Sequence, residues 1–262
     1  MTEGSLTHIS NVRIFDGDHV LEARSATIDG ETIVRLGGPP PPGTEPIDGT
    51  GCTLLPGLID SHTHATPEAR QLALRFDVTT VCVMQGYWTP EQKKALDARR
   101  DLADALTSLF AVTAPSGHPH ELLPKDAVPR MPAGIDPGEF LKYAATTEDA
   151  RAVVRKRVAQ DADYIKIMVE DGVVFGKPGT PDLSDEVLAA ACDEAHRHGK
   201  MALVHAFTVR ATRRALAAGV DGFMHLFIDQ PVSAEMIEAI ARSGVFVCPT
   251  IVAGASIIGD SD

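Results

Sequence analysis

From residue 53 onward, short apolar segments of strand length alternate with longer segments that have the periodicity of amphipathic helices. We expect seven strands, at residues 53–60, 78–84, 108–114, 164–169, 202–207, 222–227 and 245–250. These runs are apolar on both faces, as in a parallel sheet covered by helices. The repeated strand–helix unit predicts a (β/α)8 TIM-type barrel, with an open doubly wound sheet as the alternative.

The segments between these strands carry signals for the beginning and end of helices. In residues 184–199, Ser184 is a predicted N-cap, and Gly199 can adopt the left-handed conformation that ends a helix. Residues 208–219 and 233–244 repeat this design. No GxGxxG motif follows any strand, which weakens the nucleotide-binding version of an open sheet.

The first part of the chain has a different pattern. Short strand-like segments surround Asp16-Gly17 and Asp29-Gly30, and such dipeptides are typical of hairpin turns. The Pro- and Gly-rich residues 37–46 are a predicted loop. The sequence therefore predicts a small antiparallel sheet before the strand–helix units.

Composition argues against several classes of function. A net charge of −12 without a basic stripe argues against nucleic acid as a partner. The basic run at residues 151–158 alternates with apolar residues and is predicted to be the solvated face of a helix. Four widely spaced cysteines without a CxxC motif predict buried thiols in a reducing compartment. With no signal peptide and no apolar run near the ~20 residues of a membrane helix, we expect a cytoplasmic protein.

Polar side chains interrupt the apolar strands near their carboxyl ends. They are His62 and His64 in the first strand, Lys166 in the fourth, His205 in the fifth and His225 in the sixth. A lone histidine in a strand is more often a hydrogen-bonded core residue, and a buried ammonium is costly unless it is paired. Five such residues at the strand ends that face a barrel active site instead favour a metal site. His62 and His64 are two residues apart, so both can point at one ion.

These motifs resemble the amidohydrolase superfamily, and most of all its imidazolonepropionase/Xaa-Pro dipeptidase-type branch. The resemblance rests on "LPGLIDSHTH", "DYIKIMVEDG", "ALVHA", "GVDGFMHLF" and "GVFVCPT", and it extends over residues 7 to 252. It implies a (β/α) barrel over residues 53–262 and a small β-sandwich to which residues 1–52 belong. It also implies a small-molecule substrate whose C–N bond, in an amide, cyclic amide or dipeptide, is hydrolysed by a metal-activated hydroxide.

The resemblance further implies a centre with two divalent metal ions, usually zinc. His62 and His64 would hold the more buried ion, and His205 and His225 the more exposed one. Lys166 matches a lysine that such enzymes carboxylate with CO2, and the resulting carbamate would bridge the two ions. Carboxylation also removes the buried ammonium, after the lysine has lost its proton.

Four of the six remaining histidines fall into two groups. His118 and His120 follow the third predicted strand, and His118 is predicted to contact substrate because its loop lies at the active-site face of a barrel. The intervening proline argues against a tight metal pair. His8 and His19 belong to the small sheet and are predicted to lie at its surface.

One residue of the family pattern has no counterpart, and no catalytic residue is assigned. The pattern includes an aspartate at the end of strand eight, which binds metal and shuttles a proton. Asp260 and Asp262 follow the seventh predicted strand too closely to match it. We therefore expect a fragment of a longer enzyme, a barrel completed by a C-terminal segment or a second copy, or a barrel that binds metal without turnover. Open edges at strands one and seven predict association of chains.

Overall fold

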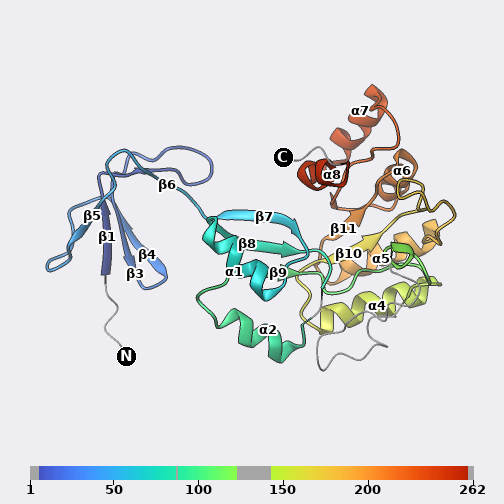
Figure 1. Ribbon diagram of the computed structural model, residues 1–262, viewed down its shortest axis with the longest axis horizontal. Helices are drawn as coiled ribbons and strands as arrows, with labels where there is room; N and C mark the ends of the chain where they lie inside the picture. The colour runs from blue at the N-terminus through green and yellow to red at the C-terminus, as the bar shows by residue number, and fades with distance from the viewer. Residues whose placement is uncertain (1–5, 87, 123–142, 259–262) are drawn as a thin grey trace. The chain divides into compact units, whose positions relative to one another are not determined.

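The computed structural model describes residues 6–86, 88–122 and 143–258 (Figure 1). Contacts between Cα atoms divide the chain into two units, residues 1–58 and 59–262. Each unit has its own sheet and its own apolar core. No helix in these described ranges is long and apolar enough to cross a membrane.

The N-terminal unit is built around a four-stranded sheet with the order β4-β3-β1-β5. Its strands are β1 (Leu6–Ser10), β3 (Ala26–Asp29), β4 (Thr32–Leu36) and β5 (Pro46–Asp48). β3 and β4 are antiparallel around Gly30, which has a φ of 58°, so the hairpin predicted from Asp29-Gly30 is confirmed. A separate parallel pair joins β2 (Arg13–Ile14) to β6 (Thr53–Leu54). The β-sandwich expected for this part stays a prediction.

His8 is buried, and the prediction that it lies at the surface is wrong. It belongs to β1, which has neighbours on both sides in the sheet, and its side chain is 1% exposed. The Nδ1 atom of His8 lies 2.8 Å from Thr27 Oγ1 on β3. A central strand turns its covered face away from water, and the sequence pattern alone does not identify which strand is central. His19 is exposed, as predicted.

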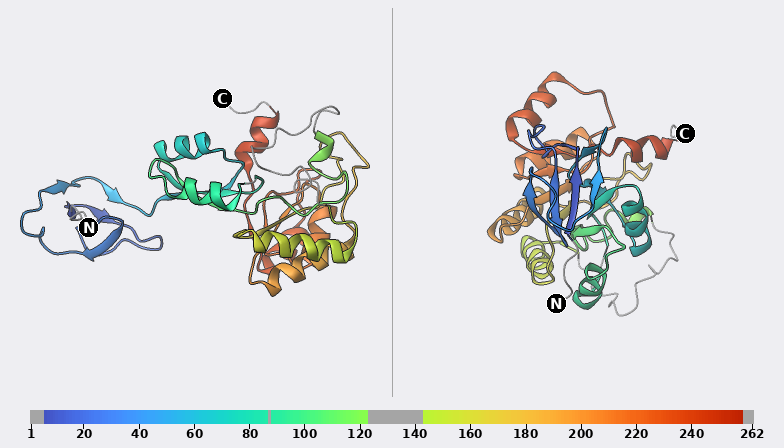
Figure 2. Two further views of the ribbon diagram at one scale, coloured as in Figure 1. Left: turned by 90° about the horizontal axis from the view of Figure 1, so that it is seen from below. Right: turned by 90° about the vertical axis from the view of Figure 1, so that its left-hand side faces the viewer.

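The C-terminal unit alternates strands and helices (Figure 1 and Figure 2). The strands are β7 (Leu58–Thr63), β8 (Val78–Val83), β9 (Asp104–Thr107), β10 (Ile165–Met168), β11 (Ala202–His205), β12 (Gly222–Phe223) and β13 (Phe246–Val247). The helices are α1 (Pro67–Arg75), α2 (Pro90–Asp97), α4 (Thr147–Ala159), α5 (Asp185–Arg197), α6 (Val209–Ala217), α7 (Ala234–Ser243), α8 (Ile251–Ile258) and the short η1 (His120–Leu122). The predicted strand–helix alternation is confirmed.

The strands of this unit form two sheets, β7-β8-β9 and β10-β11-β12-β13. β9 is parallel to β8, and β10 to β13 are parallel to one another. After β9, Val112 forms a parallel bridge to Ile167 of β10, and its N–H donates to the Lys166 carbonyl at 2.8 Å. Within the described residues the two sheets do not close into a barrel.

The third strand lies earlier in the chain than predicted. The sequence pattern favoured residues 108–114, but the structure places β9 at Asp104–Thr107. Leu109 has a φ of 57°, in the left-handed region, and this turns the chain out of the strand direction. Ser108 Oγ donates to the Met84 carbonyl at 2.9 Å and holds that turn. Residues 108–114 therefore form a loop after β9, in which Val112 makes one isolated β-bridge to Ile167 of β10.

The first predicted strand is divided and exposed. Pro56 and Gly57 separate β6 from β7, and β7 is the edge strand of its sheet. Leu58 and Ile59 are 53% and 64% exposed, so the prediction of a buried strand is wrong. Among the described residues, β7 pairs with β8 alone.

The three helices predicted from their caps are confirmed. Ser184, Thr208 and Ser233 each accept a hydrogen bond from the backbone N–H three residues later. Gly199, Gly219 and Gly244 follow with φ values of 66°, 75° and 76°. α4 and α5 bury apolar side chains against β10 and β11, among them Val153, Val154, Leu188, Ala191, Ile165, Ile167 and Val204. This core fixes the strands that carry the site.

The basic run at residues 151–158 is only partly solvated. It lies in α4, where Arg155 is exposed and pairs with Glu148 at 2.6 Å. Arg157 is 1% exposed, donates from Nε to the Phe110 carbonyl at 3.0 Å, and donates from Nη1 to Gln160. The prediction is therefore correct for Arg155 and wrong for Arg157.

The cysteines are free thiols. Cys192 is buried, Cys82 and Cys248 are half-buried, and Cys52 is exposed. The prediction of four buried thiols is thus wrong for Cys52, which lies beside the short strand β6.

Candidate functional site

The four histidines predicted as metal ligands lie close together in the C-terminal unit. The ring centroids of His62 and His64 are 5.6 Å apart, and those of His62 and His225 are 4.6 Å apart. His205 follows at 4.8 Å from His225. The elements responsible are the end of β7, the end of β11 and the segment after β12. Residues separated by as many as 163 positions in the sequence thus form one row of imidazoles.

Lys166 of β10 lies beside these histidines. Its side chain is 2% exposed, and its Nζ has no hydrogen-bond partner in the described part of the chain. Burial lowers the pKa of Lys166 to about 7. A buried amine without a partner is expensive, so this residue type at this place calls for a chemical reason.

The imidazoles of the row are held in their neutral form. Burial is the main cause that lowers the pKa of His62 to about 3 and that of His225 to about 2, and the charge of Lys166 adds to both shifts. The pKa of His205 is also well below its usual value, chiefly through burial. A neutral imidazole keeps a free lone pair, which is the form that binds a metal ion.

Histidine, cysteine and carboxylate side chains alone do not complete a metal site. Within residues 6–86, 88–122 and 143–258, no three of these side chains form a group that could hold an ion. The positive charge of Lys166 lowers the pKa of His62, His64, His205 and His225, so Lys166 lies near all four imidazoles.

The two histidines after β9 separate in the structure. His118 is buried and stacks on His205, with 4.3 Å between the ring centroids and 25° between the planes. His120 instead lies with its Nδ1 3.1 Å from the Tyr143 hydroxyl. Only His118 joins the row, in line with the expectation that the two do not form a metal pair.

Glu170 is the site residue that the sequence analysis missed. Its side chain is fully buried, and its Oε2 lies 3.2 Å from His205 Nε2. Its Oε1 accepts a hydrogen bond from the Gly172 N–H at 2.7 Å. The available signal was position, since Glu170 follows the carboxyl end of β10 just as the histidines follow or end their own strands.

The loop after β10 is anchored to α6. Asp182 Oδ1 accepts hydrogen bonds from the backbone N–H groups of Glu170, at 3.2 Å, and Leu183, at 2.8 Å. Arg214 of α6 forms an ion pair with Asp182, and Arg210 forms one with Asp171 at 2.5 Å. These pairs hold both ends of residues 170–184 and thereby fix Glu170.

Two phenylalanines form an apolar wall beside the imidazoles. Phe207 stacks on His225 at 4.4 Å between centroids and meets His205 edge-on at 4.7 Å. Phe175, from the loop after β10, stacks on His118 at 5.1 Å and meets Phe207 at 5.6 Å. A substrate at this site would therefore meet polar nitrogens on one side and aromatic rings on the other.

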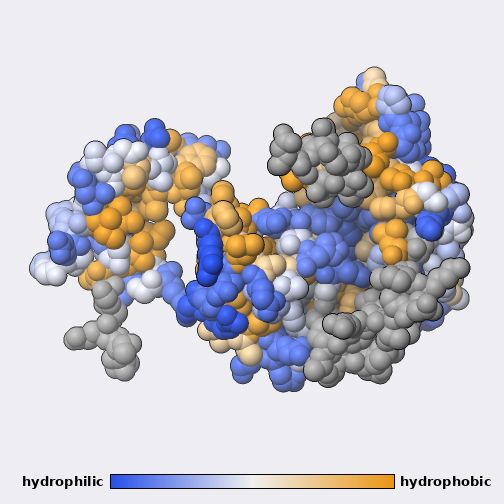
Figure 3. Space-filling model, viewed as in Figure 1, coloured by the Kyte–Doolittle hydropathy of each residue, from blue (hydrophilic) through white to orange (hydrophobic). Residues whose placement is uncertain are grey.

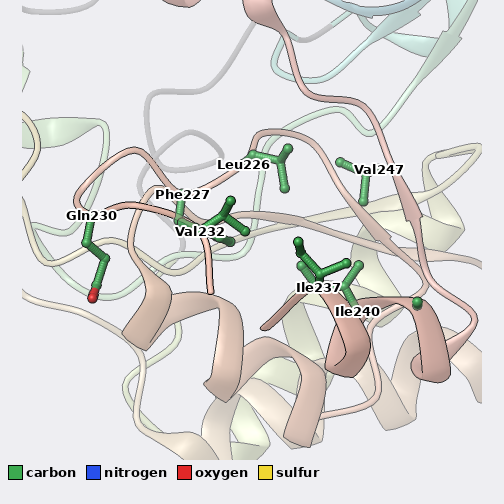
Figure 4. A pocket seen from close by; sticks show the side chains of 8 residues that line it. Leu226, Phe227, Gln230, Val232, Ile237, Ile240 and Val247 are labelled. Atoms are coloured by element: carbon green, nitrogen blue, oxygen red, sulfur yellow. The ribbon is translucent and has the colours of Figure 1, made fainter. Parts of the chain in front are cut away.

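Two of the cavities in the described part of this unit differ in their linings. One of about 720 Å³ is lined by Asp60, His62, His64 and His225, together with Thr250, whose Oγ1 lies 2.7 Å from His225 Nδ1. The other, of about 470 Å³, is lined by apolar side chains from α7, β13 and the segment after β12 (Figure 4). The first cavity is lined by three of the predicted metal ligands, and it is therefore the candidate site.

Comparisons with known proteins find a family model and several solved structures that are similar to this chain. A family model described as the amidohydrolase family matches residues 53–258. A solved amidohydrolase structure is 25% identical, with a TM-score of 0.76, and the match covers 97% of this chain and 69% of that one. A prolidase complexed with N-methylphosphonate-L-proline is 25% identical, with a TM-score of 0.75, and the match covers 97% of this chain and 69% of the prolidase. A Xaa-Pro dipeptidase with methionine bound in its active site is 25% identical, with a TM-score of 0.71, and the match covers 97% of this chain and 69% of the dipeptidase. A search of curated protein sequences found no match.

Proposed function

The chain belongs to the amidohydrolase family, and from that premise we propose that it is a metal-dependent hydrolase of carbon–nitrogen bonds. The family and its solved structures imply an α/β fold of TIM-barrel type and a hydrolase acting on amide-type bonds. The observation that carries the proposal is the row of neutral imidazoles around a buried lysine whose Nζ has no hydrogen-bond partner among the described residues.

The residues fit a centre with two divalent cations. His62 and His64 would hold one ion, and His205 and His225 the other, with zinc as the expected metal. When bound, the ions would act as Lewis acids and lower the pKa of a water molecule towards ~7. The chain's part is to supply neutral nitrogens, three of which, on His62, His64 and His225, belong to residues that line one cavity.

Lys166 would supply the remaining donors as a carbamate. With its pKa lowered to about 7, much of Lys166 is neutral near physiological pH, and its Nζ can attack the carbon of CO2. One N–C bond forms, one proton is released, and the product carries two oxygens and a negative charge. This reaction would account for a buried lysine whose Nζ has no hydrogen-bond partner within the described ranges.

His118, Phe175 and Phe207 would bind the substrate. His118 stands next to His205 at the edge of the row, where a ring N–H can donate to a substrate carbonyl. The two phenylalanines exclude water and favour an apolar side chain next to the scissile bond. We therefore propose small dipeptide-type or cyclic amides as substrates, in keeping with the prolidase and Xaa-Pro dipeptidase relatives.

Proton transfer to the leaving nitrogen is not assigned to any residue. The family aspartate of strand eight has no counterpart in the described residues, and Asp260 and Asp262 lie outside them. The alternative is that the chain binds metal without turnover. The experiment that tests the site also distinguishes this alternative from hydrolysis.

That experiment combines metal analysis with an activity assay. Protein purified without chelator, in the presence of bicarbonate, is expected to hold more than one equivalent of zinc per chain. It is expected to hydrolyse at least one member of a panel of N-acyl amino acids, Xaa-Pro dipeptides and cyclic amides. His62→Asn should lose both properties. His198→Asn is the control and should retain them, because His198 is the C-cap residue of α5 and pairs with Glu194.

Less than one equivalent of metal in well-folded protein would contradict the metal centre. A full complement of metal with no turnover across the panel would contradict hydrolysis by this chain and support the alternative.

A further inference from the structure

We propose that Glu170 is a positioning residue that decides which nitrogen of His205 is free to bind a metal ion. The proposal rests on the metal centre described above but concerns a residue outside the predicted ligand set. Glu170 and His205 are both buried, with side chains 0% and 5% exposed. No bulk water can exchange with the contact between them, so their own hydrogen bonds determine where protons lie.

Each carboxyl oxygen of Glu170 has a contact in which it can act as the hydrogen-bond acceptor. The N–H of Gly172 can only donate, so Oε1 of Glu170 is its acceptor at 2.7 Å. Oε2 of Glu170 faces His205 Nε2 at 3.2 Å. Both oxygens of a carboxylate accept, so we infer from this contact that the ring proton of His205 is on Nε2 and that Nδ1 carries the lone pair.

Gly172 makes this arrangement rigid. Its φ is 79°, and a Cβ at this position would lie 2.0 Å from the Lys177 carbonyl oxygen. No other residue type fits there without moving the loop. The backbone N–H that fixes Glu170 is itself fixed by the shape of the chain.

The ring of His205 is also prevented from rotating. His118 covers one face at 4.3 Å between centroids, and Phe207 meets it edge-on at 4.7 Å. His225 meets it at 4.8 Å with an interplanar angle of 80°. Because the orientation of the ring is fixed, the tautomer of His205 determines the direction in which the free lone pair points. A carboxylate that receives the second N–H of a ligating histidine is a common support of metal sites.

The test variant is Glu170→Gln. Glutamine has one oxygen where glutamate has two, and Gly172 N–H requires that oxygen. The NH2 group then faces His205 Nε2, which must accept, so the ring proton moves to Nδ1. We expect the metal affinity of the site to fall roughly 10- to 100-fold, as for losses of such supporting contacts. Competition with a chromophoric chelator measures this change for zinc and cobalt.

The tautomer itself is measured without metal. The 15N shifts of the His205 ring, assigned in metal-free protein, should show a protonated Nε2 in the natural chain and a protonated Nδ1 in Glu170→Gln. This signature would not respond to a merely structural role. Glu170→Asp, which remains acceptor-only, should keep the natural tautomer.

Glu194→Gln is the matched control. Glu194 on α5 is also buried and lies 3.3 Å from a histidine, His198, outside the site. Its change to glutamine should leave the His205 tautomer and the metal affinity unchanged.

The proposal and the metal centre can fail separately. A protonated Nδ1 in the natural chain, or an unchanged tautomer and metal affinity in Glu170→Gln, would overturn the role of Glu170. Absence of metal binding in the natural chain would overturn the centre while the ring shifts still decide the tautomer. If Glu170→Gln does not fold, the ring shifts of the natural chain and Glu170→Asp decide the question.

Discussion

At the scale of single residues, the burial of Lys166 is unfavourable for folding. Its side chain is buried, its Nζ lacks a hydrogen-bond partner among the described residues, and its pKa falls to about 7. In the unfolded chain the same lysine has a pKa of ~10.4. Folding therefore requires either deprotonation of the amine or burial of its charge.

This lysine predicts a pH dependence of stability. Between about pH 7 and ~10.4 the unfolded state binds more protons than the folded state, so stability rises as pH rises through that window. The slope from one group is at most ~1.4 kcal/mol per pH unit. In metal-free, CO2-free buffer, urea unfolding should show this rise for the natural chain. Lys166→Met should lose the slope, should be more stable at pH 7 and should not support the metal centre.

Lys200→Met is the control for the preceding prediction, because Lys200 lies outside the row of imidazoles. It should retain the slope of the natural chain. Equal slopes in the natural chain and Lys166→Met would contradict the assignment of the effect to Lys166.

At the scale of elements, α6 controls the geometry of the site from outside it. Arg214 forms ion pairs with Asp182 and Asp185 and donates to the Leu183 carbonyl. Asp182 in turn accepts the N–H of Glu170. A helix on the outer side of the unit thus fixes a carboxylate that touches His205.

Arg214→Ala should loosen the loop at residues 170–184. Arg214 is 17% exposed, and its loss leaves charged partners partly buried, so we expect a cost of about 1–3 kcal/mol. Hydrogen exchange should become faster in this loop, and urea unfolding should show the loss of stability. Arg213→Ala removes a neighbouring arginine that is 50% exposed and should change stability by less than ~0.5 kcal/mol. Equal exchange in both variants would contradict the role of Arg214.

Sequence patterns predicted the elements well where local signals decide them. The caps Ser184, Thr208 and Ser233 and the row of histidines needed only local chemistry and strand polarity. The third strand was misplaced because Leu109 adopts a left-handed conformation that the apolar run does not reveal. Glu170 was missed because its partner lies 35 residues later and is defined by the fold.

At the scale of the whole molecule, apolar side chains remain exposed at both edges of the strand series. Ile59 on β7, Leu72 on α1 and Phe76, the C-cap residue of α1, are 64%, 55% and 70% exposed. Ile237 on α7 and Phe246 on β13 are 54% and 45% exposed. Hydrophobic residues gather around α7 in Figure 3, where the apolar cavity of Figure 4 also lies. Exposed patches of this kind favour association.

We expect this chain to associate as its concentration rises. Ile237→Gln should weaken that association, because Ile237 lines the apolar cavity on α7. Sedimentation velocity over a range of concentrations measures the effect. Glu238→Gln is the control on the same helix, since Glu238 is exposed and pairs with Arg242. A chain that stays monomeric throughout would contradict the prediction.

The anchored loop after β10 also defines what a directed-evolution library could change. The two ends of the loop are not expected to tolerate substitution. Asp171 and Asp182 pair with arginines of α6, and a side chain at Gly172 would clash with the backbone. The tip, residues 173–179, is largely exposed, yet it carries Phe175 to the ring of His118. Under the proposed function, we therefore expect substitutions at the tip to alter which substrates bind, while the anchored ends of the loop keep Glu170 in place.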